Sequence, residues 1–159
     1  MKTKLTKMIM GSLSFDCALV CLLAAMTLST QSTAQAAPDG RCHAGLLRGF
    51  YIWTWDGYQN FGGYPVPKAL LLGIQFNGNG TFTIPFGTIN IGGIPHDGGG
   101  AVGTYTVAAD CAGTLQVTGG TSFNMYVGAG AQQLWITQTG GGPGDGTGLG
   151  VGTATRQPE

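Results

Sequence analysis

The 159-residue sequence predicts an all-β fold, a single antiparallel β-barrel of about eight strands in meander order. Short runs in which apolar and polar residues alternate recur along the chain, which is typical of strands. Clusters of Gly, Asn, Asp or Pro separate these runs, and no segment after residue 36 has the apolar period of a helix. A two-sheet β-sandwich is the alternative. We favour the barrel because closure removes the edges that a sheet with few charges cannot protect.

The first half of the chain contains three expected strands. The first covers residues 47–55. Pro65-Val66-Pro67 is expected to interrupt the chain between this strand and the next, because proline cannot join a central ladder. The second, residues 69–76, places alternate apolar side chains on one face. Asn77-Gly78-Asn79-Gly80 then predicts a tight hairpin turn, because Asn-Gly readily adopts the positive φ that such turns require. The chain returns as a third strand over residues 81–86.

The second half begins with residues 88–100, which we interpret as a short strand at 89–91 followed by a glycine-rich loop. Glycines within the later strands suit the tight bends of a barrel. A further loop is expected at residues 140–148. The remaining strands are expected at residues 101–108, 114–118, 122–128, 133–139 and 149–156.

Residues 1–36 have the organisation of a secretory signal. Three lysines within the first seven residues precede an apolar run at 18–26, and small and polar residues follow, ending in Ala34-Gln35-Ala36. The apolar run is shorter than the about 20 residues that span a bilayer. We therefore expect cleavage near Ala36 and Ala37, a secreted or periplasmic product, and no stable membrane insertion. Residues 37–159 are expected to form the single β-barrel domain.

Cys42 and Cys111 are the two cysteines that follow the predicted signal. In a chain exported to an oxidising compartment, this pair favours one disulfide. A loop of about 70 residues corresponds to a stabilisation of at most ~4 kcal/mol by chain entropy. There is no C-x-x-C motif, and His43 is the one neighbouring ligand type, so no metal site is expected at the cysteines.

Charged residues make up only 9% of the sequence, whereas roughly a quarter is typical of a globular domain. The chain after residue 36 carries four positive and six negative side chains, a net charge of −2. A nucleic-acid-binding protein needs a basic surface, so nucleic acid is not an expected partner. Few repulsive charges also make homo-oligomers an expected form.

Several segments resemble a group of bacterial secreted proteins that look like the allene oxide cyclase barrel, which is similar in shape to the lipocalin-like calycins. The resemblance implies an eight-stranded barrel. It carries over no catalytic residue, because the shared motifs are turns, strand glycines and one cysteine, and the lipocalin G-x-W opening is absent. The segments that carry it are Gly49-Phe50-Tyr51, residues 73–80 (GIQFNGNG), 103–107 (GTYTV), 110–115 (DCAGTL) and 152–156 (GTATR).

Aromatic residues are frequent in the expected strands. In a hollow barrel such rings line an apolar ligand, and tyrosine hydroxyls orient it. In a filled barrel the same rings form the core, and both interpretations remain open. Arg156, on a last strand that lies beside the first, is expected to stack on Trp53 or Trp55. The candidate ligand-binding residues are Tyr51, Trp53, Trp55, Tyr105 and Trp135.

His96-Asp97 is the most reactive pair in the sequence. A histidine beside a carboxylate can act as a general base, whereas the alternative without a catalytic role is a solvated Asp-Gly turn. His96, Asp97 and Tyr105 are therefore weak catalytic candidates, since no partnered nucleophile accompanies them. His96 and His43 lack a metal-ligand spacing, and the glycine-rich segments lack the residues of a phosphate loop, so neither metal nor cofactor is expected.

These observations leave three functions open. The leading hypothesis is a secreted barrel that binds an apolar small molecule or lipid-like ligand in its interior. The alternatives are a cavity isomerase or cyclase of the allene oxide cyclase type, and an envelope structural or interaction protein without a ligand. A filled barrel would favour the interaction protein, and a cavity without a titratable group would favour binding over catalysis.

Overall fold

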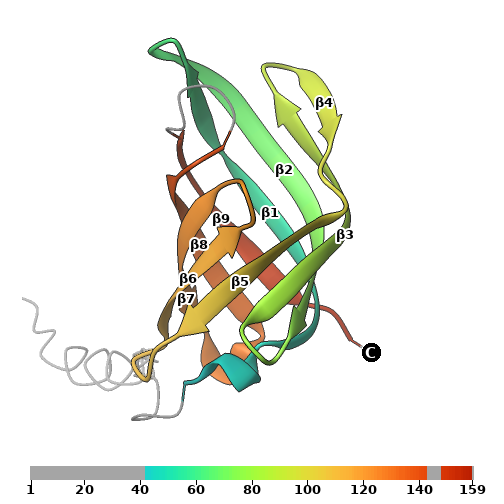
Figure 1. Cartoon of the computed structure of the whole chain (residues 1–159), viewed down its shortest axis with the longest axis vertical. Coiled ribbons are helices and arrows are strands. Elements are labelled where there is room, and N and C mark those ends of the chain that lie inside the picture. The colour runs from blue at the N-terminus through green and yellow to red at the C-terminus, as the bar shows by residue number, and fades with distance from the viewer. Residues whose placement is uncertain (1–41, 143–147, 159) are drawn as a thin grey trace, which may run out of the picture. The chain divides into compact units, whose positions relative to one another are not determined.

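The computed structural model describes residues 42–142 and 148–158, so the expected signal, residues 1–36, lies outside the described residues. The described chain folds into an all-β barrel with two short 3-10 turns (Figure 1). The turns are η2 (Ala44–Leu46) and η3 (Ala129–Ala131). The strands are β1 (Arg48–Phe61), β2 (Tyr64–Asn77), β3 (Thr81–Ile91), β4 (Ile94–Asp97), β5 (Ala101–Val107), β6 (Ala112–Val117), β7 (Ser122–Val127), β8 (Gln133–Gly140) and β9 (Gly148–Arg156).

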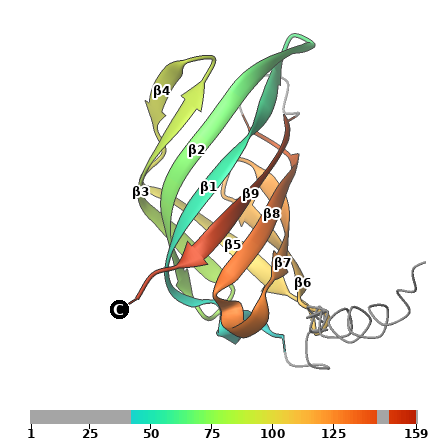
Figure 2. The ribbon, with the colours of Figure 1, turned by 180° about the vertical axis from the view of Figure 1, so that it is seen from behind.

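Eight of these strands form a closed antiparallel ring. Each strand pairs with the next along the chain, except that β3 pairs with β5 across the β4 excursion. The pairing of β1 with β9 closes the ring, and Figure 2 shows β1 lying between β2 and β9. The predicted meander barrel is confirmed.

β4 lies outside the ring, where the sequence predicted a glycine-rich loop. The first residues of β3, Thr81 to Ile84, pair with β5, and the last, Thr88 to Ile91, pair with β4. Gly92 and Gly93 turn the chain with φ of 61° and 87°. The four residues of β4 are all exposed, so the apolar alternation that predicts a strand is absent from them.

Residues 64–67 belong to β2, so the expectation that Pro65-Val66-Pro67 interrupts the chain before the second strand is wrong. Pro67 pairs with Tyr58 of β1, and its carbonyl accepts a hydrogen bond from the Gly92 N–H. The backbone of Pro67 therefore points away from β1, toward the turn between β3 and β4. No N–H is required from β2 on that side, which is why proline is compatible with the strand.

The hairpin between β2 and β3 agrees with its prediction. Gly78 and Gly80 have φ of 77° and 88°. The Asn79 side chain accepts hydrogen bonds from the Thr81 N–H at 3.1 Å and the Thr81 hydroxyl at 2.7 Å. The turn thus depends on two positive-φ glycines and on one asparagine that bonds to the backbone beyond it.

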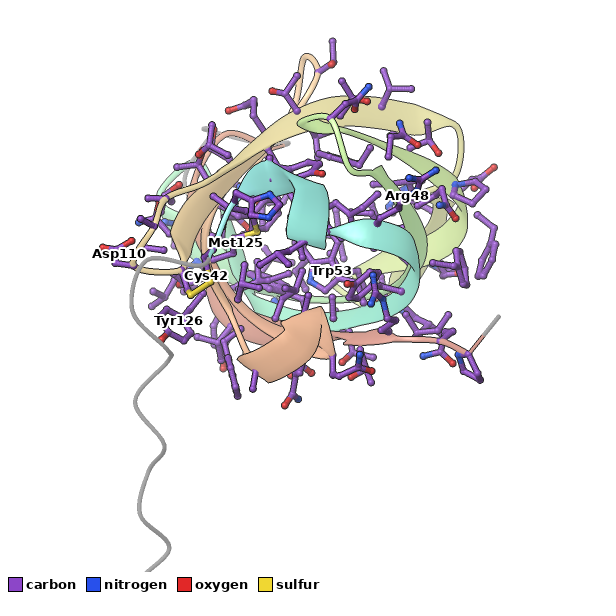
Figure 3. The ribbon with its side chains drawn as sticks, turned by 90° about the horizontal axis from the view of Figure 1, so that it is seen from below. Cys42, Arg48, Trp53, Asp110, Met125 and Tyr126 are labelled. Carbon is purple, nitrogen blue, oxygen red and sulfur yellow. A yellow bond between two sulfur atoms is a disulfide. The ribbon has the colours of Figure 1, made fainter. Side chains whose placement is uncertain are left out.

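One end of the barrel is covered by η2, which lies across it in the view of Figure 3. A disulfide between Cys42 and Cys111, as predicted, attaches the segment before η2 to the turn between β5 and β6, with a Cα–Cα distance of 5.0 Å. Leu47, just after η2, is fully buried. We call the end of the barrel that η2 covers the η2 end, and the opposite end the cavity end. No helix among the described residues is long and apolar enough to cross a membrane.

Candidate functional site

The barrel interior is filled toward the η2 end and hollow toward the other. Near η2, Phe76 packs edge-on against Tyr51 and Tyr105, at centroid distances of 5.2 and 5.0 Å. At the opposite end is a cavity of about 370 Å³. Its walls are Trp53, Lys68, Leu70, Leu72, Ile84, Ile89, Gly98, Ala101, Val117, Gly119, Gly120, Thr121, Phe123 and Gly142.

Trp53 and Phe123 separate the cavity from the filled half. Their rings meet edge to face with centroids 4.9 Å apart, and both side chains are buried. The alternation of β1, β2 and β7 directs these and neighbouring apolar side chains inward. At the rim, the cavity is bordered by the turn between β6 and β7, at Gly119 and Gly120.

Lys68 is the polar anchor of this cavity and was not identified from the sequence. It lies on β2 in the same inward phase as Leu70 and Leu72, and only 5% of it is exposed. Its Nζ donates to Gln59 Oε1 on β1 at 3.2 Å and to Gln138 Oε1 on β8 at 3.5 Å. Both glutamines are buried. Three distant segments thus place one cation and two amides together.

The two amides are oriented by further hydrogen bonds. Gln138 Nε2 donates to the Gly141 carbonyl at 3.1 Å and to Gln59 Oε1 at 3.5 Å. These bonds occupy the amide nitrogen of Gln138 and leave its oxygen directed at the lysine. The two amide oxygens serve as acceptors for two of the three N–H donors of the ammonium, which has no acceptor of its own.

Trp55 completes the surroundings of the ammonium. Lys68 Nζ lies 5.2 Å from the centre of the Trp55 ring, within the range of a cation–π contact. Burial lowers the pKa of Lys68 below its ordinary value, because removal from water penalises the charged form. Within the described residues no carboxylate forms an ion pair with Lys68, and Asp56, which follows Trp55, is exposed on the outer face.

Two indole donors are also buried in this half of the barrel. Trp53 and Trp55 are almost fully buried, and neither Nε1 has a hydrogen-bond partner among the described residues. An unpaired buried donor costs about 1–3 kcal/mol. Trp53 also lines the cavity, although its Nε1 itself is buried.

Tyr51 and Tyr105, two of the predicted ligand-binding residues, lie in the filled half. Tyr105 Oη donates to the Ala44 and Leu47 carbonyls, both at 2.9 Å, and Tyr51 Oη donates to the Ala131 carbonyl at 2.7 Å. Burial raises the pKa of each phenol. The hydroxyls hold η2 and η3 against the barrel, and neither residue lines the cavity.

Arg156 stacks on an aromatic ring, but on Tyr51 and not on Trp53 or Trp55. Its guanidinium carbon lies 5.5 Å from the Tyr51 ring centre, because Arg156 pairs with Tyr51 in the register of β1 and β9. Its Nη2 donates to the Arg48 and Leu46 carbonyls. The expected cation–π contact exists, two residues nearer to the η2 end.

His96 and Asp97 lie on β4, outside the ring and exposed. Asp97 Oδ1 accepts a hydrogen bond from the Gly99 N–H at 2.8 Å, which is the geometry of an Asx turn. His96 pairs with Ile89 in the β3–β4 ladder. The structure therefore does not bring these two residues together with Tyr105, which is at the η2 end.

Trp135 lies on the outer face of β8 with 49% of its surface exposed, so the expectation that it lines the interior is wrong. Its neighbours Leu134 and Ile136 are buried, and alternation on a strand directs the residue between them outward. Trp135 contacts Tyr126 of β7 at a centroid distance of 6.2 Å. Together they border a shallow outer groove with Val151 of β9.

The hollow half therefore combines apolar walls with one buried cation. Among the described residues no three His, Cys, Asp or Glu side chains are close enough to hold a metal ion. Of the predicted site residues, Trp53 lines the cavity and Trp55 contacts its lysine. Comparisons of the chain with protein-family models, with curated proteins and with solved structures find no match.

Proposed function

We propose that this chain is an extracytoplasmic barrel that binds an apolar small molecule inside the end opposite η2. The observation that carries the proposal is the cavity of about 370 Å³, whose walls are mainly Leu, Ile, Val, Trp, Phe and Ala side chains. Small-molecule sites are concave and largely apolar, have a few placed polar groups, and measure about 300–1,000 Å³. This cavity suits one ligand at the small end of that range.

Two further features support the compartment and the type of barrel. The Cys42–Cys111 disulfide is compatible with an oxidising compartment, as the sequence of residues 1–36 also suggests. The meander of eight strands is compatible with kinship to allene oxide cyclase-like barrels, which we keep as part of the proposal. That kinship concerns the fold and assigns no chemistry.

Binding is favoured over the two alternative functions. Lys68 is the one ionisable side chain among the described residues that line the cavity, and a single cation held by amides can anchor a ligand. No second ionisable group among these residues accompanies it as an acid–base partner. An interaction protein without a ligand would not need a hollow half. Exposed apolar residues such as Leu149 and Val151 on β9 leave association with other copies compatible with binding.

The test uses N-phenyl-1-naphthylamine, a neutral dye that fluoresces in apolar surroundings, with the full chain. Ala101 lines the cavity, whereas its neighbour Val102 is half exposed on the outer face. Ala101→Phe should abolish saturable dye binding because the ring fills the cavity. Val102→Phe is the matched control and should bind as the unaltered chain does.

A second pair of variants tests the same prediction in case Ala101→Phe does not fold. Val117 lines the cavity, and Thr118, which follows it, is exposed. Val117→Phe should abolish binding and Thr118→Phe should not. The proposal fails if the unaltered chain shows no saturable binding, or if both cavity variants keep a native circular dichroism spectrum and still bind the dye.

A further inference from the structure

The buried ammonium of Lys68 is the least balanced charge in the described structure. Transfer of an ion out of water costs several kcal/mol unless a counter-charge or sufficient hydrogen bonds compensate. No described carboxylate pairs with Lys68, and the compensation comes from two amide oxygens and the face of Trp55. These groups favour an ammonium but supply no full negative charge.

The donor count of Lys68 is also incomplete. An ammonium has three N–H donors, and two of them have acceptors, Gln59 Oε1 and Gln138 Oε1. No described residue provides a third acceptor, while Lys68 itself is among the residues that line the cavity. A ligand in the cavity is therefore placed to supply both the missing acceptor and the missing charge.

The cavity accommodates one negative charge. Lys68 is the one cation among the described residues that line it, so a monoanion neutralises this charge, whereas a dianionic phosphate would leave an uncompensated charge in apolar surroundings. Leu70, Leu72 and Ile84 supply apolar walls for the rest of the ligand.

We infer that the ligand is an apolar monocarboxylate, whose carboxylate forms an ion pair with Lys68 Nζ and whose hydrocarbon part fills the apolar portion of the cavity. The inference rests on the proposed function, since it requires that the cavity be occupied. It adds the chemical class of the ligand and the residue that selects it. The Lys68 amine remains unmodified, so binding is reversible.

The experiment compares decanoate with decan-1-ol, which has the same chain length and no charge. Each displaces N-phenyl-1-naphthylamine from the full chain, from Lys68→Met and from Lys68→Arg, at pH 7. Loss of a charge-assisted hydrogen bond should weaken decanoate by about ten- to one-hundred-fold in Lys68→Met. Decan-1-ol should lose much less affinity than decanoate does in Lys68→Met, because a neutral hydroxyl forms no ion pair with the ammonium. Lys68→Arg should retain a preference for decanoate.

A spectroscopic readout separates ion pairing from a merely structural role. Lysine-selective labelling of the full chain gives signals from Lys2, Lys4, Lys7 and Lys68, and the Lys68 signal is the one absent from Lys68→Met. Decanoate should raise the pKa of Lys68, because an anion beside it favours the charged form. Decan-1-ol should lower it or leave it unchanged.

The outcomes distinguish the two proposals. If neither decanoate nor decan-1-ol displaces the dye, and the dye itself fails to bind, the proposed function is wrong. If both compounds bind equally and Lys68→Met changes neither, the cavity binds apolar molecules and the inference about the carboxylate is overturned. A preference for decyl phosphate over decanoate would likewise overturn it, and would assign the site to a dianion.

Discussion

Lys68 Nζ lies 5.2 Å from the centre of the Trp55 ring, inside a barrel where no described carboxylate pairs with it. The Trp55 ring can lie beside Lys68 because the neighbouring residue of β9 is Gly150, which has no side chain. A Cβ at Gly150 would come within 2.4 Å of Trp55 Cζ2. The absence of a side chain on β9 thus allows an indole on β1 to face a lysine on β2. This relationship lets the charge of Lys68 be tested through its neighbour.

Replacement of Trp55 should change the titration of Lys68. Trp55→Phe keeps an aromatic face, whereas Trp55→Leu removes it, so the pKa of Lys68 should fall further in the leucine variant than in the phenylalanine variant. Lysine-selective NMR of the ligand-free chain measures both. Equal values in the two variants would show that the ring face does not stabilise the ammonium.

Lys68→Met should alter the pH dependence of stability. Burial lowers the pKa of Lys68 in the folded chain, so the folded state releases this proton more readily than the unfolded state does. As pH rises from the folded-state pKa toward 10.5, the unfolded chain holds more protons, and the unaltered protein gains stability relative to Lys68→Met. Below that window the difference between the two proteins should be flat.

Urea titrations of both proteins from pH 7 to pH 11 provide this measurement. Tyr51 and Tyr105 have raised pKa values, and their titration removes stability above pH 10. Both proteins contain these tyrosines, so their contribution cancels in the difference. A difference in unfolding free energy that is independent of pH would contradict the lowered pKa of Lys68.

The alternation of apolar residues predicted most of the ring but missed its anchor. Leu70, Leu72, Ile74 and Phe76 share the interior face, as expected. Lys68 lies on the same interior face two residues before Leu70, but a pattern defined by apolar residues alone does not include it. Gln138 extends the phase of Leu134 and Ile136 in the same way. Polar residues in phase with a core strand are the signal that would have found this site.

Other differences arose where a local pattern depends on a distant neighbour. Pro67 is compatible with β2 because its backbone faces the turn after β3, a relationship formed when β2 and β3 pair. The partner of Arg156 follows from the register of β1 and β9, which places Tyr51 opposite it. Trp135 is a different case, because the local alternation of Leu134 and Ile136 already directs it outward. Register and edge position are tertiary properties, and local sequence does not specify them.

Arg156→Ala should destabilise the η2 end. The variant loses hydrogen bonds to the Leu46 and Arg48 carbonyls and the contact with the Tyr51 ring. We expect a loss of about 1–2 kcal/mol, reduced by the partial exposure of the side chain. Thermal melting of Arg156→Ala and of Arg156→Lys, which keeps the charge without the planar guanidinium, provides the comparison. An unchanged melting temperature for Arg156→Ala would show that Arg156 does not stabilise the η2 end.

The Cys42→Ser/Cys111→Ser double variant should lose stability without losing the ligand site. The disulfide closes a loop between residues 69 positions apart, so its removal should cost about 2–4 kcal/mol by freeing the unfolded chain. Neither cysteine lines the cavity, whose walls come from β1, β2, β3, β5, β6 and β7. At a temperature where the double variant stays folded, N-phenyl-1-naphthylamine should bind within about two-fold of the unaltered chain. Since loop entropy acts on unfolding and not on the cavity walls, a large loss of dye affinity in the folded variant would mean that the η2 end also shapes the cavity.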